Sequence, residues 1–535
     1  MIGPDLSSFR ALWRQYRACR RNKRNTLNAL AFEIDAEAKL LALQQELRDH
    51  TYHPGRSICF VTEGRKPREV FAADFRDRVV HHLLVAYQER IFEPLFIHDS
   101  YACRAGKGTL AASDRLMQFL RQVTVNGRRP AWALKLDVAS FFPSIHKQTL
   151  FEIIARRIKN PEVLWLTRTI LFHDPTTNYR FRSLDRRASE PGTAGYPIPA
   201  RKSLFGKANE CGLPIGNLTS QSWGNVYLNE LDQFVKRTLK CRFYVRYVDD
   251  LVLLAEDPAT LAVWRGEIER FLRERLLLEL RATGQEPVPV RRGIEFVGWK
   301  TWWNRRLPRR QAVGNLLQRV NHFERLAVRP VYNGLARRID LTTRKSGRLR
   351  PGGTQRQDLT AIERLRDALA SYSGHLRHGA AWRQWERVWG RHPWLGLVFE
   401  REGWTIGDRW RWRRIARVRR FRHQYSWLVR HAPQDCLVFC QVGRFVEFYG
   451  PQRLTAEQVL GLTRARLPRA GYALTAGFPV RMATQYTRRA LEAGRPIIEV
   501  RAGPRGLRTG CRPRMPTAVL MPAHCHPISQ RESVG

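Results

Sequence analysis

Two adjacent acids interrupt an apolar stretch near the middle of the chain. Residues 247–250 read Tyr-Val-Asp-Asp and lie between the apolar runs 243–245 and 251–255. This pattern predicts two short strands joined by a tight turn that carries Asp249 and Asp250. Charge at the tip of an apolar hairpin is costly unless a cation binds it, whereas aspartate in a solvent-exposed turn is ordinary. The hairpin alone therefore leaves both interpretations open.

Asp137 favours the cation site. It closes the apolar segment 131–138, which we expect to be a buried strand. An aspartate at a strand end beside an acidic hairpin can form a two-metal site, because Mg²⁺ prefers hard oxygen ligands. Two cations about 4 Å apart activate an attacking hydroxyl group and stabilise a pyrophosphate leaving group. Asp137, Asp249 and Asp250 are therefore the candidate catalytic and metal-binding acids.

The elements that must position these acids follow from the hydrophobic pattern. Helices are expected over residues 5–50, and a basic hairpin at 56–72. Further helices are expected at 76–93, 147–159, 162–171, 219–238, 310–327 and 359–376, a second hairpin at 294–303, and strands with one helix at 435–501. The Pro/Gly/Arg-rich segment 503–535 is expected to be disordered.

The composition indicates a polyanionic partner. The 535 residues include 93 Lys and Arg against 48 Asp and Glu, which gives a formal charge of +45 and favours nucleic-acid binding. A hydrophobic fraction of 43% excludes wholesale disorder, and no apolar run approaches the roughly 18 residues of a membrane span. Neither a secretory signal nor a disulfide framework is recognisable, so we expect reduced thiols and a cytoplasmic location.

Asp137, the Tyr-Val-Asp-Asp box and a Gly-rich segment between them resemble, in this order, a reverse transcriptase. Several independent blocks carry the resemblance across about residues 10–380. They are 76–82 (Arg-Asp-Arg-Val-Val-His-His), 100–104 (Ser-Tyr-Ala-Cys-Arg), 137–145, 212–221 (Gly-Leu-Pro-Ile-Gly-Asn-Leu-Thr-Ser-Gln), 293–299 (Gly-Ile-Glu-Phe-Val-Gly-Trp) and 369–379. The resemblance implies a right-hand polymerase, with fingers, a palm built on an antiparallel sheet, and a helical thumb.

The resemblance also implies roles for single residues. The three acids and the Val138 carbonyl would hold two Mg²⁺ ions, for which Mn²⁺ can substitute, and the Phe142 ring would exclude a ribose 2′-hydroxyl. The implied nucleotide-binding residues are Lys66, Arg68, Val138, Phe142, Ile215, Gly216 and Gln221, and the implied primer-gripping residues are Gly298 and Trp299. The alternatives are simple core packing for Phe142 and a solvated basic hairpin for Lys66 and Arg68.

One stretch departs from the family pattern. Reverse transcriptases often place a lysine shortly before the primer-gripping hairpin, where it can protonate the leaving pyrophosphate. Residues 280–285 read Leu-Arg-Ala-Thr-Gly-Gln and contain no lysine. Arg281 can replace the charge of that lysine, but arginine is a poor proton donor.

Residues 215–221 (Ile-Gly-Asn-Leu-Thr-Ser-Gln) make the resemblance to reverse transcriptases more specific. They resemble the enzymes of diversity-generating retroelements, which copy a template RNA with errors concentrated at adenines. The implied partners are a template RNA, a DNA primer or cDNA, dNTPs and a small basic accessory protein, with no membrane. Two alternatives stay open: a defence-type or other bacterial reverse transcriptase without a retargeting role, and a catalytically weak scaffold that binds RNA or heteroduplex.

Residues 435–500 resemble the mismatch-reading N-terminal domain of MutS-type proteins. A Phe-x-Glu pair reads the mismatch in that family, and the pair would be Phe445 and Glu447 here. Arg444 replaces the family's Asp, and Val446 replaces its Tyr. The chain has no P-loop, so repair signalling is not expected. The alternative is a domain that only docks RNA or protein, with Phe445 in its core.

The expected fold class is an α+β multidomain chain, a right-hand polymerase followed by a small C-terminal mixed α/β domain. The expected domains are N-terminal helices and fingers (1–130), palm (131–303), thumb (304–380), a Trp/Arg-rich helical connector (381–430), a domain resembling MutS domain I (431–502) and a disordered tail (503–535).

Overall fold

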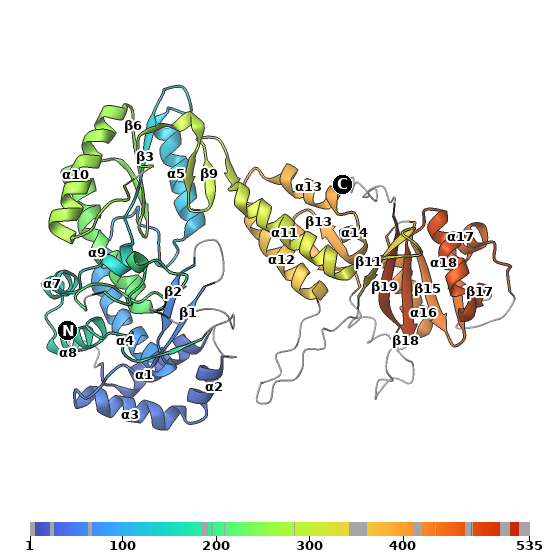
Figure 1. Ribbon diagram of the computed structural model, residues 1–535, viewed down its shortest axis with the longest axis horizontal. Coiled ribbons are helices and arrows are strands. Elements are labelled where there is room, and N and C mark those ends of the chain that lie inside the picture. The colour runs from blue at the N-terminus through green and yellow to red at the C-terminus, as the bar shows by residue number, and fades with distance from the viewer. Residues whose placement is uncertain are drawn as a thin grey trace. The chain divides into compact units, whose positions relative to one another are not determined.

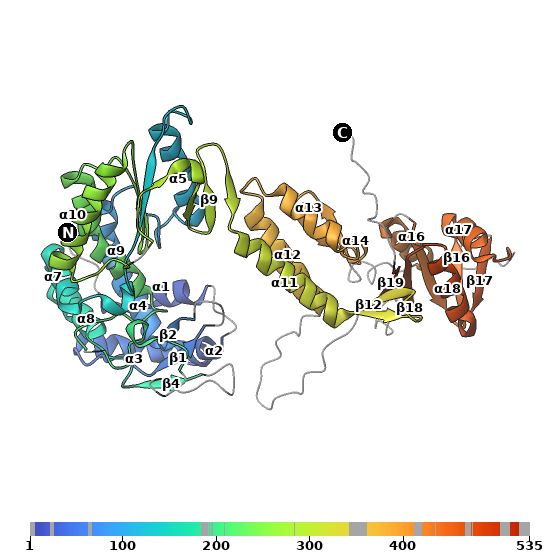
Figure 2. The ribbon, with the colours of Figure 1, turned by 45° about the horizontal axis from the view of Figure 1, so that its top comes forward.

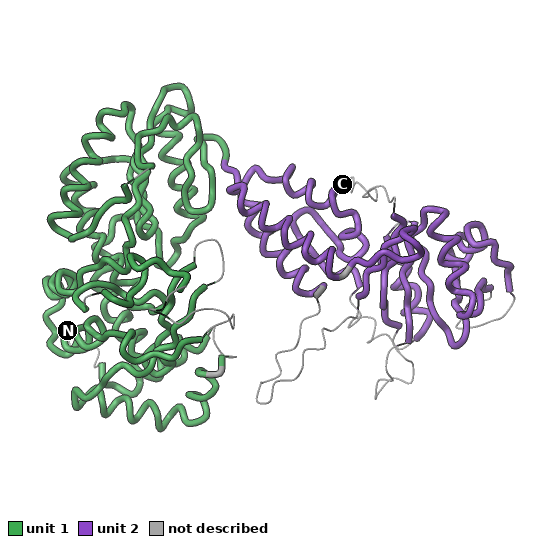
Figure 3. The backbone as a smooth tube through the Cα atoms, in the orientation of Figure 1, with its two compact units in different colours: residues 1–305 green, residues 306–535 purple. Residues whose placement is uncertain are grey.

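The computed structural model describes residues 6–21, 26–62, 67–182, 191, 193, 196–207, 209–282, 284–341, 361–410, 420–433, 435–465, 472, 474–502 and 514–523. The chain divides into two compact units, residues 1–305 and 306–535, which Figure 3 colours separately. Each unit has its own hydrophobic cores. None of the helices in the described ranges combines the length and the hydropathy needed to cross a bilayer.

Helix α4 (Phe75–Phe92) is the central element of the first unit's N-terminal half. Asp74 caps it by accepting a hydrogen bond from the Arg76 backbone N–H. Its apolar side chains pack in one core with those of α1 (Phe9–Arg20), α2 (Leu27–Glu33) and α3 (Ala36–Arg48) (Figure 1). These helices confirm the helical pattern expected over residues 5–50.

The expected basic hairpin is formed by β1 (Ser57–Val61) and β2 (Glu69–Ala72), and β4 (Tyr179–Phe181) pairs with β1 in parallel. The buried Glu69 carboxylate fixes this sheet to the segment 196–204. It accepts hydrogen bonds from the hydroxyl groups of Tyr196 (2.9 Å) and Ser203 (2.7 Å) and from the Leu204 backbone N–H (2.8 Å). The hairpin therefore has a defined place on the first unit.

A four-stranded antiparallel sheet carries the acidic hairpin. Its order is β5 (Phe243–Tyr247), β6 (Asp250–Ala255), β3 (Trp132–Asp137) and β7 (Val288–Pro289). Helices α9 (Leu218–Gln233) and α10 (Pro258–Leu276) cover one face, and α5 (Thr109–Val123) covers the other (Figure 1). Because successive side chains point to opposite faces and both faces are covered, the strands are continuous apolar runs rather than alternating ones.

Short elements complete the first unit. They are η1 (Glu93–Leu95), α6 (Phe141–Ser144), α7 (Lys147–Arg157), α8 (Pro161–Leu171), η2 (Ala200–Lys202), the π-helical η3 (Phe234–Thr238), η4 (Val290–Arg292), β8 (Ile294–Phe296) and β9 (Trp299–Thr301). Strands β8 and β9 form the second expected hairpin.

Helices and one hairpin begin the second unit. They are β10 (Arg306–Pro308), α11 (Arg310–Ala327), α12 (Ala361–Leu376), α13 (Trp382–Arg391), α14 (Leu395–Val398), the paired strands β13 (Phe399–Glu402) and β14 (Thr405–Asp408), and α16 (Phe421–His431). Three of their tryptophans, Trp385, Trp389 and Trp394, are buried in one core. The thumb and connector expected at 304–380 and 381–430 share this core and are not separate domains.

A seven-stranded mixed sheet forms the rest of the second unit. Its order is β11 (Val328–Val331), β12 (Ala336–Asp340), β19 (Arg514–Pro522), β18 (Ile497–Ala502), β15 (Leu437–Val442), β16 (Phe445–Tyr449) and β17 (Thr475–Pro479). Helices α17 (Pro451–Leu460) and α18 (Ala483–Glu492), with η5 (Val480–Met482), lie on one face of the sheet. The helices that begin the second unit pack against the other face (Figures 1 and 2).

The sheet corrects two boundaries. Residues 514–522, expected within a disordered tail, form the strand β19 between β12 and β18. Residues 328–340, expected within the thumb, supply two strands of the same sheet. A local pattern did not reveal either, because the partners of β19 lie far away in the sequence, and its two prolines and its arginine do not suggest a strand.

Candidate active site and nucleic-acid contacts

The three candidate acids meet at one end of the four-stranded sheet. Asp137 is the last residue of β3 and lies directly opposite Asp250, the first residue of β6. Asp249 occupies the turn before β6, and its carbonyl oxygen accepts a hydrogen bond of 3.3 Å from the Val138 N–H. The strand register that the apolar runs impose therefore brings together the acids that the sequence identified.

The electrostatics of Asp249 reflect this gathering of charge. Burial, together with the negative charges of Asp137 and Asp250, raises the pKa of Asp249 to about 6. Arg68, at the start of the β2 side of the basic hairpin, acts in the opposite direction and lowers it. Asp249 is thus a carboxylate in a negative environment that a cation would relieve.

Basic side chains engage the two flanking acids. The Arg281 guanidinium lies 2.5 Å from Asp137 Oδ2, and Lys135 Nζ lies 3.1 Å from Asp250 Oδ1. Arg281 is positioned because the segment 279–281 runs beside the end of β3, where the Arg281 N–H donates to the Asp137 carbonyl at 2.9 Å. The departure noted in the sequence thus places an arginine directly on a candidate catalytic acid.

A divalent cation fits this donor set. In the ranges that the structure describes, no three His, Cys, Asp or Glu side chains are gathered tightly enough to form a ready-made metal cluster. The reason is visible in the ion pairs: two of the three acids are turned toward Arg281 and Lys135. Burial and the neighbouring negative charges raise the pKa of Asp249, and a bound cation would offset the cost of its charge. A metal at this site would compete with these two basic side chains.

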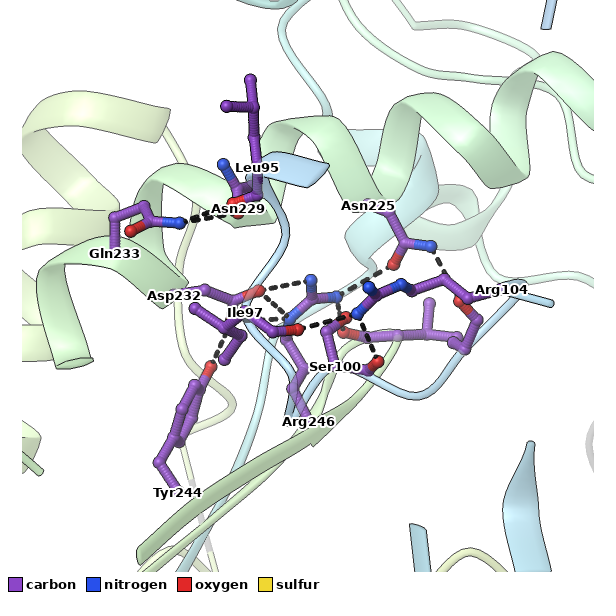
Figure 4. A network of polar contacts seen from close by, with 12 residues as sticks. Leu95, Ile97, Ser100, Arg104, Asn225, Asn229, Asp232, Gln233, Tyr244 and Arg246 are labelled. Carbon is purple, nitrogen blue, oxygen red and sulfur yellow. Dashed lines mark hydrogen bonds and ion pairs between the residues drawn. The ribbon is translucent and has the colours of Figure 1, made fainter. Parts of the chain in front are cut away.

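Arg246 holds the turn that carries Asp249, and this residue was not identified from the sequence. Its fully buried guanidinium forms a bidentate ion pair with Asp232 of α9, with N–O distances of 2.6–3.0 Å (Figure 4). It also donates to the Asn225 side-chain oxygen (3.2 Å) and to the Val248 carbonyl (3.1 Å). Burial lowers the pKa of Arg246, but the Asp232 carboxylate more than offsets this effect, so the net pKa is raised.

The Val248 backbone explains why the turn needs such support. Val248 has a φ of +55°, a left-handed conformation that is unfavourable for a β-branched residue. The hydrogen bond from Arg246 satisfies the carbonyl of this residue, directly before Asp249. An arginine inside an apolar strand was the available signal, because a buried charge requires a partner.

The residues implied to bind a nucleotide surround this end of the sheet in part. Arg68 is exposed and close enough to influence Asp249, whereas Lys66 lies outside the described residues. Phe142 is half-buried, with its ring 5.1 Å from that of Phe141. Gln221 is exposed on the first turn of α9.

Ile215 and Gly216 contact the basic hairpin. The Ile215 carbonyl accepts a hydrogen bond of 2.9 Å from the Phe71 N–H. Gly216 has a φ of +120°, and a Cβ atom there would lie 2.8 Å from Val70 Cγ1 and 3.1 Å from the Phe71 carbonyl. Glycine is therefore required for packing against β2, a role that is separate from the implied approach to a base pair.

The two primer-gripping residues differ in accessibility. Gly298 lies in the β8–β9 turn with a φ of +90°, after Val297 at +42°. The Trp299 side chain is buried. Contacts from this hairpin to a primer would therefore come from the turn backbone, while Trp299 contributes to packing.

The two residues of the Phe-x-Glu pair in the second unit differ in solvent exposure. Phe445 begins β16 and is 45% exposed, whereas Glu447 is 5% exposed and accepts a hydrogen bond from the Tyr449 hydroxyl. The expectation that Glu447 contacts a base does not fit this arrangement, because its carboxylate is turned into the domain. The alternative of Phe445 in the core is wrong, since its ring faces solvent.

Comparison with known proteins agrees with this geometry. Residues 64–282 match the family model of the reverse transcriptase (RNA-dependent DNA polymerase), and residues 420–502 match MutS domain I. The chain is 25% identical over 221 residues to the uncharacterized 91 kDa protein in cob intron of Schizosaccharomyces pombe, covering 41% of this chain and 23% of that protein. It is 24% identical over 211 residues to the group II intron-encoded protein LtrA of Lactococcus lactis subsp. cremoris, covering 39% and 30% respectively.

The chain therefore spans less than a third of the length of either relative. Among solved structures, apo telomerase from Candida tropicalis aligns over 47% of this chain and 53% of its own, with 9% identity and a TM-score of 0.31. The family matches fall on separate units of the fold. The first unit contains the segment that matches the reverse transcriptase model, and the second contains the segment that matches MutS domain I.

Proposed function

We propose that this chain is an RNA-directed DNA polymerase that copies a template RNA into cDNA from dNTPs. The observation that carries the proposal is the register of β3 and β6, which sets Asp137 opposite Asp250 with Asp249 in the adjoining turn. Reverse transcriptase domains use divalent metal ions, and the repulsion among the three acids favours such ions here. Mg²⁺ is the proposed metal, with Mn²⁺ as a substitute.

Each residue of the site has a defined task in this proposal. Asp137, Asp249, Asp250 and the Val138 carbonyl would hold the metal ions, which would lower the pKa of the attacking hydroxyl group. Arg68, with Lys66, neutralises the triphosphate. Phe142 lies beneath the sugar and excludes a 2′-hydroxyl group. Arg281, which pairs with Asp137, would supply positive charge beside the leaving group.

Primer extension tests this proposal with nucleotide choice as a second readout. The wild-type chain should extend a DNA primer on an RNA template with dNTPs, and chelation of divalent ions with EDTA should stop it. Phe142→Ala should admit ribonucleotides that the wild type rejects, while Phe151→Ala, which changes a phenylalanine of α7, should not. Extension by the wild type that is unaffected by EDTA would contradict the proposed chemistry.

We further propose that copying is error-prone at template adenines, as in diversity-generating retroelements. Ile215 supports this proposal, because an alkyl side chain cannot form the hydrogen bonds by which Gln would monitor the nascent base pair. The alternatives are a bacterial reverse transcriptase without a retargeting role and a catalytically weak RNA-binding scaffold. The proposed partners include a small basic accessory protein, and the proposed location is the cytoplasm.

Sequencing of cDNA tests the fidelity proposal. Wild type and Ile215→Gln copy the same RNA, and we expect adenine errors to exceed other errors in the wild type and to fall in Ile215→Gln. Ile215→Val, which keeps the alkyl character, is the matched control and should retain the error pattern. If adenine errors in the wild type are no commoner than its other errors, the proposal of adenine-directed errors is wrong.

The second unit is proposed to contact nucleic acid through Phe445 rather than through Glu447. A phenyl ring exposed at a strand end can enter a weakened base step, as mismatched duplex provides. Loss of preference for mismatched over matched duplex in full-length Phe445→Ala would support this role, and unchanged binding would favour simple docking of RNA or protein.

A further inference from the structure

A stripe of arginines runs along one side of helix α1, far in sequence from the acids. Arg10, Arg14, Arg17 and Arg21 recur at intervals of four, three and four residues, which is the spacing of one helix face. All four side chains are exposed, and the buried residues of α1 lie on the other side. We call this set the α1 stripe.

Acidic side chains do not balance the α1 stripe. From residue 6 to residue 25 the sequence contains seven basic residues and no acidic one. Arg20, on another side of α1, pairs with Glu33. Within the described part of the chain, none of the four stripe arginines takes part in an ion pair or a side-chain hydrogen bond. Their charge is therefore available to an external ligand.

The stripe also opposes the stability of the helix that carries it. Arg10 lies in the first turn of α1, where the helix dipole disfavours positive charge and no acid is present. Neighbouring stripe arginines lie three or four residues apart, so that they repel one another. Helix stability therefore does not explain the stripe, whereas a polyanion lying along it would relieve both effects.

An exposed tryptophan accompanies the arginines. Trp13 is 40% exposed and directly precedes Arg14. Its ring is held by Phe9, stacked at a centroid distance of 6.1 Å, and by Tyr16 at 5.5 Å. A preordered indole beside guanidinium groups is the combination that binds unpaired nucleotides, since bases stack on aromatic rings while phosphates pair with arginine.

We propose that the α1 stripe and Trp13 bind single-stranded RNA, with the guanidinium groups on phosphates and the indole stacked on an unpaired base. The identity of the strand as RNA rests on the proposed polymerase function. The stripe runs from Arg10 to Arg21, twelve residues, which is about 16 Å of helix. It is a second RNA contact, distinct from the acids and the nucleotide-binding residues.

Binding of an unprimed single-stranded RNA to the full-length chain tests this proposal. The test variant is R10Q/R14Q/R17Q/R21Q. The control is R156Q/R265Q/R270Q/R273Q, which removes the same charge from arginines that pair with Glu230, Glu286, Glu267 and Glu269. Four phosphate contacts to a single strand contribute about 2.8 to the slope of log affinity against log salt. We expect the test variant to lose about that much slope and the control variant to lose little.

Two further readouts separate binding from folding and from catalysis. Trp13→Ala should weaken RNA binding about fivefold or more without changing the salt slope, because stacking is not electrostatic. The test variant should be at least as thermostable as the wild type and should incorporate dNTPs normally on a saturating primed template. Equal slopes for the test variant and the wild type would overturn the proposal. A wild type that binds RNA through the stripe but incorporates no dNTP would overturn only the polymerase function.

Discussion

Arg246 connects the interior of the first unit to the turn that holds Asp249. Its partner Asp232 is fully buried, and its remaining donors reach Asn225 and the Val248 carbonyl. A buried ion pair by itself is weak evidence for stability, because desolvation offsets much of the attraction. We interpret the bond to Val248 as a positioning contact, since it satisfies the carbonyl group of the strained residue next to the proposed catalytic acid Asp249.

Uncoupling stability from positioning tests this role. Arg246→Met should destabilise the chain by about 3–5 kcal/mol, because it leaves the Asp232 charge buried without its partner. The double variant Arg246→Met/Asp232→Asn should recover most of that loss. The asparagine side-chain oxygen can still accept the hydrogen bond that the Tyr244 hydroxyl group donates to Asp232 at 2.7 Å. Extension by the double variant should stay at least tenfold below wild type. Urea unfolding and primer extension measure the two quantities, and wild-type extension in the double variant would refute positioning.

His81 of α4 predicts sensitivity to acid. Burial, together with the nearby His82, Arg78 and His173, lowers its pKa to about 3. An unfolded chain takes up this proton below about pH 6.5, whereas the folded chain does not. The contribution of neutral His81 to the free energy of unfolding is therefore present above pH 6.5 and is lost as the pH falls. Between pH 7 and pH 5 the free energy of unfolding should drop by about 2 kcal/mol from this group.

His81→Leu should remove this part of the pH dependence. The measurement is urea unfolding of the full chain at pH 7 and pH 5, compared with His322→Leu, which changes an exposed histidine of α11. His322→Leu should keep the wild-type difference between the two pH values. A His81→Leu chain as acid-sensitive as the wild type would show that another group is responsible.

At the scale of elements, β19 joins the two halves of the second unit. It pairs with β12, which follows α11, and with β18 of the MutS-like segment. The Arg338 guanidinium adds a bidentate ion pair across β19 to Glu499, at 2.8 and 3.0 Å. The MutS-like segment and the helices before it are thus parts of one sheet-centred structure.

Truncation tests this dependence on β19. A chain that ends at residue 512 lacks β19 and should lose the cooperative unfolding of the second unit, because β12 and β18 would each expose a row of unpaired backbone groups. A chain that ends at residue 523 keeps β19 and is the matched control. Calorimetry distinguishes the two, and an unchanged second-unit transition in the shorter chain would mean that β19 is dispensable.

Local patterns and long-range contacts account for what the sequence predicted and what it did not. The acidic hairpin and the strand ending at Asp137 were predicted because apolar runs bounded by polar residues specify strands locally. The basic partners of these acids were not predicted. Lys135 reaches Asp250 through the register of the strands, and Arg281 reaches Asp137 because the chain returns to the end of β3 after α10. The burial of Glu447 also depends on tertiary packing, through Tyr449.

At the scale of the whole molecule, the positive charge is organised rather than uniform. Two of the three site acids, Asp137 and Asp250, form ion pairs with basic neighbours, while the α1 stripe is left without acidic partners among the described residues. A chain of charge +45 will bind phosphate at many places, so affinity alone cannot identify its function. Chemistry at the three acids is what separates a polymerase from a scaffold.

The most direct test of the central claim is extension of a DNA primer on an RNA template by the wild-type chain and by Asp249→Asn. The substitution removes one carboxylate charge while preserving size, and burial and repulsion make the native charge unfavourable without a cation, so folding should be retained. We predict that the wild type incorporates dNTPs, that Asp249→Asn incorporates none above background, and that both bind the primed template with similar affinity. Full extension by Asp249→Asn would contradict the assignment of these acids as the catalytic centre.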